Sequence, residues 1–157
     1  MPSAEASIVR FSKVHKYMRP ASIRHFARVL EAEVTKGKRF DCLITGNQEL
    51  RRLNKTWRGK DQVTDVLSFP VDGTVHQLDD FLGDIAISSA RARAQAREFG
   101  HSPDTEIQIL MLHGVLHLMG MDHEMDNGRM LRAENRFRAR LGLPRGLIER
   151  ESEPESE

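Results

Sequence analysis

The stretch from Ile107 to Met119 is apolar at almost every position, and it constrains the fold more than any other part of this 157-residue chain. It follows a strong helix start. Ser102 can cap a helix, Pro103 fits the first turn, and Asp104 places negative charge at the positive end of the helix dipole. A helix that is apolar all round has to be covered on every side. The sequence therefore predicts a central helix that the rest of a single domain surrounds.

Two histidines interrupt this apolar helix, and a third follows a glycine. His113 and His117 are four residues apart, so they lie on one helix face, about 40° apart around the axis and about 6 Å apart along it. Gly120 can take the left-handed conformation that ends a helix, which would return His123 to the same face. We therefore predict one metal ion per chain, bound by His113, His117 and His123.

Three imidazole ligands with a fourth position left open are typical of a catalytic zinc site, with zinc–nitrogen distances of about 2.0 to 2.1 Å. Imidazole also suits nickel, copper and iron, so zinc is favoured on geometry and availability. Leaving imidazoles unpaired on so apolar a helix would cost roughly several kcal/mol, which argues against isolated core histidines. The other histidines follow no ligand pattern, and we expect them at the surface: His15, His25, His76 and His101.

The spacing HxxxHxxGxxH also occurs in metzincin peptidases, which carry a glutamate as general base directly after the first histidine. Gly114 occupies that position here. Without this carboxylate, ordinary peptide hydrolysis is disfavoured.

The remaining chain alternates between strand and helix patterns. Strands are expected at 7–13, 40–45, 65–69 and 83–88, and the third should lie at a sheet edge because Pro70 cannot donate to a ladder. Helices are expected at 20–35, from a capping box of Thr45 and Gln48 to Gly59, from Ser88 or Ser89 to Gly100, from Ser102 through Met119, and at 124–141.

The second of these helices carries two residues of interest at its end. Leu50, Leu53 and Trp57 recur at the spacing of a buried stripe, and Arg58 falls just before the glycine that should end the helix.

Composition indicates a folded cytoplasmic protein. Hydrophobic residues make up 39% and charged residues 30%, as in ordinary globular domains. No stretch approaches the roughly 20 apolar residues of a membrane helix, and the N-terminal MPSAEASIVRF lacks an export pattern. We therefore expect no membrane association. The single cysteine, Cys42, lies in an apolar run, so we expect no disulfide-linked partner.

The net charge of +1 conceals a division along the chain. Residues 149–157 hold five Glu and one Arg, a balance of −4, which leaves +5 for residues 1–148. We expect one domain at 1–148 and a disordered acidic tail at 149–157. A mildly basic body is compatible with a phosphate-bearing partner without requiring one.

Three blocks of this sequence resemble the YbeY family of bacterial endoribonucleases. HGVLHLMGMDH at 113–123 is similar to the family signature HGxLHLxGYDH, with Met121 in place of tyrosine. LNKTWRGKDQVTDVLSFP at 53–70 resembles LNxxYRxxDxxTDVLSFP, with Trp57 in place of tyrosine, and LGDIAIS at 82–88 resembles LGDIxIS. The blocks follow the family's order at compatible separations.

The resemblance implies an α+β fold in which helices cover a small sheet, here of four strands and about five helices. It also implies a zinc-dependent, single-strand-specific endoribonuclease that acts in 3′-end maturation of small-subunit (16S) ribosomal RNA and in ribosome quality control. By motif position, the zinc ligands are His113, His117 and His123, and Arg58 is the catalytic, substrate-binding arginine. The implied partners are single-stranded RNA, ribosomal RNA and the ribosome.

Arginine at this position suits the implied chemistry. Phosphodiester cleavage builds up negative charge, which the two-pronged guanidinium of Arg58 could stabilise. Two other functions remain open. One is a metal-dependent hydrolase of another substrate, such as a peptide laid along the strand at 65–69. The other is a ribosome assembly factor that the metal only stabilises.

Overall fold

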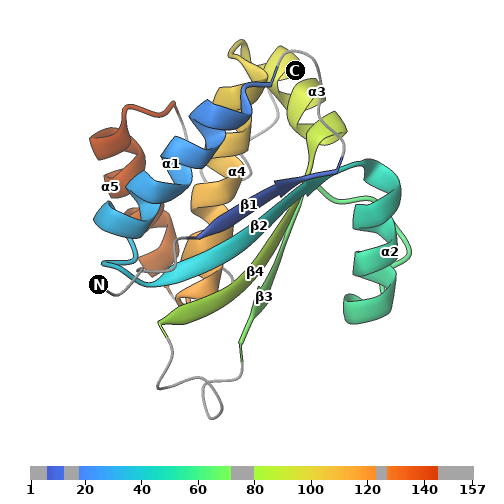
Figure 1. The fold of residues 1–157 in the computed structure, drawn as a ribbon, viewed down its shortest axis with the longest axis horizontal. Coiled ribbons are helices and arrows are strands. Elements are labelled where there is room, and N and C mark those ends of the chain that lie inside the picture. The colour runs from blue at the N-terminus through green and yellow to red at the C-terminus, as the bar shows by residue number, and fades with distance from the viewer. Residues whose placement is uncertain (1–6, 13–17, 72–79, 123–126, 145–157) are drawn as a thin grey trace.

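The computed structural model describes residues 7–12, 18–71, 80–122 and 127–144. Its elements follow the alternation expected from the sequence, with four strands and five helices among the described residues (Figure 1). In chain order they are β1 (Ile8–Phe11), α1 (Pro20–Glu33), β2 (Arg39–Thr45), α2 (Asn47–Arg58), β3 (Val66–Pro70), β4 (Phe81–Ser88), α3 (Ser89–Phe99), α4 (Pro103–Leu118) and α5 (Arg129–Leu141). The fold class is α+β, as predicted.

The strands form one mixed sheet in the order β1-β2-β4-β3. Strands β1, β2 and β4 are parallel, and β3 runs antiparallel to β4 at the edge, where Pro70 stands opposite Gly83. The prediction of an edge strand at this place is confirmed. Pro70 is compatible with the edge because it has no N–H to donate to a further strand.

The two faces of the sheet are covered differently. Helices α1, α4 and α5 lie on one side and α2 lies on the other (Figure 1). Along β2, the side chains of Phe40, Cys42 and Ile44 are buried in the main core, while Asp41 and Leu43 alternate toward the α2 side. Eleven residues of α4 are buried, so the predicted central helix is confirmed.

Most helix ends match the sequence signals. Ser88 accepts a hydrogen bond from Arg91 N at 3.1 Å and caps α3, and Ser102 caps α4 in the same way. Gly59 and Gly100 end α2 and α3 in the left-handed conformation.

Two expectations about helix ends were wrong, and a third differs from the structure by two residues. Thr45 does not cap α2, because its Oγ1 accepts a hydrogen bond from Ser12 Oγ at 2.6 Å and Gly46 becomes the N-cap. Helix α1 ends at Glu33, two residues before the expected end at about Thr35. Helix α5 begins only at Arg129, after two left-handed residues, Asn127 and Gly128.

Two side chains lie elsewhere than expected. The His101 side chain is only 14% exposed, and its Nε2 lies 2.6 Å from Oε1 of the fully buried Glu106. Trp57 was expected in a buried stripe, yet 69% of it is exposed. The positions of His15, His76, His123 and the acidic tail lie outside the described residues. None of the described helices combines the length and apolarity needed to cross a bilayer.

Gly83 allows the edge strand to approach its neighbours closely. Its φ is +139°, and an added Cβ would lie 2.3 Å from the Phe69 carbonyl oxygen and 3.1 Å from Leu118 Cδ2. We predict that Gly83→Ala lowers the free energy of unfolding by about 2 to 4 kcal/mol, through backbone strain and overpacking together.

Urea unfolding of the purified variants measures this loss. Gly100→Ala is the matched control, since Gly100 also has a positive φ (+77°) but has open space around its Cβ position. It should cost only about 1 kcal/mol. Equal losses in the two variants would show that close approach at Gly83 contributes nothing.

Candidate functional site

The two histidines of α4 converge, as their spacing requires. Nε2 of His113 lies 3.2 Å from Nε2 of His117, and the ring centroids are 4.7 Å apart with the planes at 74°. His113 is buried and His117 is half-buried. Two nitrogens bound to one tetrahedral zinc at about 2.0 to 2.1 Å each lie roughly 3.3 Å apart. The pair therefore has a separation suited to two ligands of a single ion.

The same contact is also compatible with a hydrogen bond between the imidazoles, in which His117 Nε2–H donates to His113 Nε2. Among the described residues, no third side chain joins the pair to form a ligand set. The third predicted ligand, His123, lies outside them.

Glu134 of α5 holds His113 in one orientation. His113 Nδ1 lies 2.8 Å from Glu134 Oε2, and the glutamate side chain is 1% exposed. With the carboxylate ionised, Nδ1 carries the proton and donates, so the lone pair of Nε2 points toward His117. A carboxylate behind an imidazole in this way is common in metal centres, where it fixes the tautomer of the ligand and raises its basicity.

The sequence contains a signal for Glu134 that the apolar pattern alone did not reveal. Met130, Glu134 and Phe137 follow one another at i, i+4 and i+7, and all three are buried. A carboxylate on the inward stripe of a helix needs a buried partner. Such a residue is a candidate to stand behind a predicted histidine ligand.

The residue after His113 faces the sheet. A Cβ at Gly114 would lie 3.0 Å from Ile85 Cγ2 and 3.2 Å from Ser68 Oγ, and Ser68 Oγ donates to the Gly114 carbonyl at 3.1 Å. A glutamate at this position would therefore start inside the packed layer between α4 and β4. The glycine that argued against a peptidase thus also fits a position where a side chain would be tightly packed.

Arg58 lies on the other side of the sheet from the histidines. It is the last residue of α2 and is exposed. Leu50 of α2 packs with Leu67 and Ala86 in a small cluster separate from the main core. No hydrogen bond or ion pair within the described residues joins Arg58 to His113 or His117. The structure therefore brings two predicted ligands together and places the arginine across β3.

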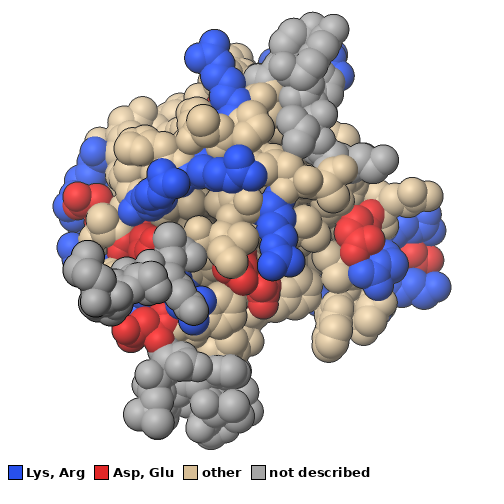
Figure 2. Space-filling model, in the orientation of Figure 1, with Lys and Arg blue, Asp and Glu red and all other residues tan. Residues whose placement is uncertain are grey.

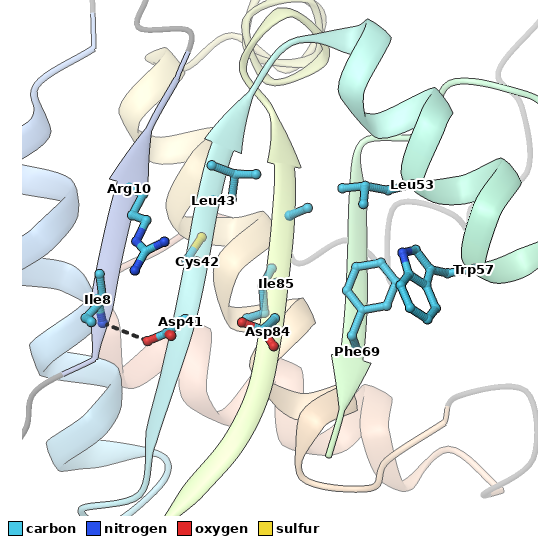
Figure 3. Close-up of a pocket in the computed structure, with 11 residues that line it drawn as sticks. Ile8, Arg10, Asp41, Cys42, Leu43, Leu53, Trp57, Phe69, Asp84 and Ile85 are labelled. Atoms are coloured by element: carbon cyan, nitrogen blue, oxygen red, sulfur yellow. Dashed lines mark hydrogen bonds between the residues drawn. The ribbon is translucent and has the colours of Figure 1, made fainter. Parts of the chain in front are cut away.

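A groove of about 440 Å³ opens between α2 and the face of the sheet that α2 only partly covers (Figure 3). Its walls are Leu53 and Trp57 from α2 and Phe69 from β3, and Arg10, Asp41 and Asp84 line its opposite side.

The carboxyls of Asp41 and Asp84 come from paired positions of β2 and β4. Burial raises the pKa of Asp84, and the nearby Asp41 raises it further, against a smaller lowering by Arg10.

Figure 2 shows Lys and Arg side chains scattered over the molecule with Asp and Glu between them, so no single basic surface dominates the face drawn there.

Comparison with known proteins covers nearly the whole chain. Residues 10–142 match the family model described as endoribonuclease YbeY. The chain is 59% identical over 150 residues to the endoribonuclease YbeY of Solibacter usitatus, covering 96% of this chain and 98% of that protein. It is 54% identical over 114 residues to the endoribonuclease YbeY of Koribacter versatilis, covering 71% and 70% of the two chains.

The fold agrees with a solved structure. The solution structure of TM1509 from Thermotoga maritima superposes with a TM-score of 0.56 at 26% identity, covering 83% of this chain and 86% of that one. The family model spans all the described elements from the end of β1 to the end of α5, and the motif blocks of the sequence lie within it. This chain belongs to the YbeY endoribonuclease family.

Proposed function

We propose that this protein is a zinc-dependent endoribonuclease that cuts single-stranded RNA in the cytoplasm. Its proposed roles are 3′-end maturation of small-subunit ribosomal RNA and ribosome quality control, with ribosomal RNA and the ribosome as partners. The observation that carries the proposal is the 3.2 Å separation of the His113 and His117 Nε2 atoms, with the Glu134 carboxylate behind His113. The relatives' name, endoribonuclease YbeY, supports the reaction.

His113, His117 and His123 would hold the ion. Zinc, when bound, would supply a Lewis acid that polarises a phosphoryl oxygen and lowers the pKa of water. Glu134 orients the His113 ring, because its carboxylate accepts the hydrogen bond from Nδ1–H and so leaves the lone pair of Nε2 pointed at the site. Arg58 would bind the scissile phosphate from the far side of β3. Its guanidinium is exposed and makes no ion pair among the described residues, so both prongs are available to the phosphate.

The chain offers less support for the alternatives. A peptidase would need a general base, and the position that carries it in metzincins faces the sheet at Gly114. A ribosome assembly factor stabilised by its metal would use the same buried Glu–His pair, so only a cleavage assay distinguishes that function.

Cleavage should depend on both the metal and the strandedness of the substrate. We predict that the metal-replete protein cuts an unstructured RNA, leaves a duplex of the same sequence intact and loses activity on chelation. Zinc should restore the activity, and chelation should also lower the melting temperature because ligand binding stabilises the folded state. Gel analysis, elemental analysis and thermal melts measure these effects. Full cleavage by protein verified to be metal-free would exclude the proposed role of zinc.

Glu134 should control metal affinity through His113. Glu134→Gln retains the side-chain volume but removes the charge, and we predict a metal affinity about 10 to 100 times weaker in a chelator competition. The matched control is Glu106→Gln, which disturbs another Glu···His pair, between the fully buried Glu106 at the start of α4 and His101, away from the converging histidines. The control should lose stability but keep parental metal affinity. Equal metal affinities in Glu134→Gln and the parent would contradict the positioning role.

Arg58 should affect cleavage without affecting the metal. We predict that Arg58→Ala slows single-turnover cleavage by about 10² to 10³, at full metal occupancy and nearly parental stability, since the side chain is exposed. Arg58→Lys keeps the charge but loses the planar fork, so it should stay well below the parent.

Arg51→Ala on the same helix is the control for Arg58, because Arg51 is also exposed but is ion-paired with Asp61 at 2.7 Å. It should cleave at close to the parental rate. Cleavage by Arg58→Ala within a few-fold of the parent would remove Arg58 from the mechanism.

A further inference from the structure

Trp57 is the only tryptophan of the chain and the most exposed of its large apolar side chains among the described residues, at 69%. Single exposed apolar residues are common and need no explanation. Trp57, however, lines the groove with Leu53 and Phe69, and its ring meets that of Phe69 edge to face, with centroids 6.4 Å apart and planes at 67° (Figure 3). Phe69 thus supports the indole while most of the indole surface stays open to a ligand.

The arginines of α2 differ in whether they are ion-paired. Arg51 is paired with Asp61, and Arg52 with Glu49. Arg58 directly follows Trp57, is exposed and makes no ion pair among the described residues. An open aromatic face beside a cation that is available for an anion is the arrangement used to bind single-stranded nucleic acid, whose bases stack and whose phosphates pair.

The opposite side of the groove restricts how such a strand could lie. Asp41 and Asp84 stand at paired positions on adjacent strands. Arg10 lies on the same side and offsets one of these two charges, so the side keeps an excess of one carboxylate that repels phosphate, while both carboxyls can accept hydrogen bonds from the amino groups of bases. The phosphate backbone is therefore directed toward the α2 side, where Arg58 lies, and the bases toward the groove.

We propose that Trp57 is a stacking platform for an unpaired base of the RNA and that the groove beside it is a nucleobase subsite. This inference rests on the proposed ribonuclease function and adds a base-binding element to it. Consecutive residues of the edge strand connect the two sites, because Ser68 contacts Gly114 next to His113 and Phe69 points the other way, to Trp57. An RNA strand that crosses the outer edge of β3 could reach both the histidines and Trp57. A base inside a duplex cannot, because its two faces are already stacked.

The indole itself reports on this contact. Metal-replete protein is titrated with a 2′-O-methyl oligoadenylate whose integrity after the titration is verified on a gel. We expect saturable quenching of Trp57 fluorescence by the single strand, and no comparable change with a duplex of equal length or with inorganic polyphosphate, which offers charge without bases.

Variants then measure the energetic contribution. Anisotropy of the labelled oligoadenylate should show binding to Trp57→Ala about tenfold weaker or more, and binding to Trp57→Phe within about threefold of the parent, because phenylalanine keeps an aromatic face. Phe99→Ala, which removes an aromatic residue 45% exposed on α3, should bind like the parent. Thermal melts should show all three variants folded.

An affinity of Trp57→Ala within twofold of the parent overturns the inference, whether or not the fluorescence responds. If the parent and this variant also cut RNA equally well, the proposed ribonuclease function stands without the subsite. A parent that neither binds nor cuts single-stranded RNA overturns both. Quenching by an amphipathic peptide rich in Leu and Lys, with none by RNA, would overturn the inference in favour of a protein-docking groove.

Discussion

The hydrogen bond between His113 and Glu134 satisfies two polar groups that the fold could not otherwise bury. Helix α4 packs against the sheet and against the helices beside it, so its imidazoles enter an apolar environment. A buried imidazole or carboxylate without a partner costs roughly several kcal/mol. Pairing them across α4 and α5 removes that cost and also leaves Nε2 of His113 facing His117. The requirement to satisfy the core and the requirement to orient a ligand are thus met by one contact.

The groove has a comparable origin in the alternation of side chains along the strands. Odd and even residues of β2 point to opposite faces, so the pattern that buries Phe40, Cys42 and Ile44 also sends Asp41 to the other side. Helix α2 covers that side only in part, through a small apolar cluster around Leu50. What remains open is lined by aromatic, aliphatic and charged groups together, which is typical of a ligand-binding surface.

Local signals were sufficient for most of the fold, and long-range contacts explain the failures. Ser102 and Gly59 act through their own backbone neighbourhood, and both marked helix ends correctly. Thr45 failed as a cap because a residue 33 positions away, Ser12, engages its hydroxyl. Glu134 was missed for the same reason, since its partner lies 21 residues earlier on another helix. The converging pair on α4 followed from helical geometry alone, whereas the group behind it depends on how two helices pack.

Trp57 shows why a periodic pattern does not by itself determine burial. The spacing of Leu50, Leu53 and Trp57 is helical, but a stripe is buried only as far as something lies opposite it. Leu50 has the sheet opposite it and is fully buried, while Trp57, near the end of α2, has only the side of Phe69. Because β3 is the edge of the sheet that the described residues form, none of the described strands lies beyond it to cover the aromatic pair. A sheet that ended in a buried strand would have separated the two faces, whereas an edge strand such as β3 is the arrangement that the proposed binding of one extended RNA to both faces requires.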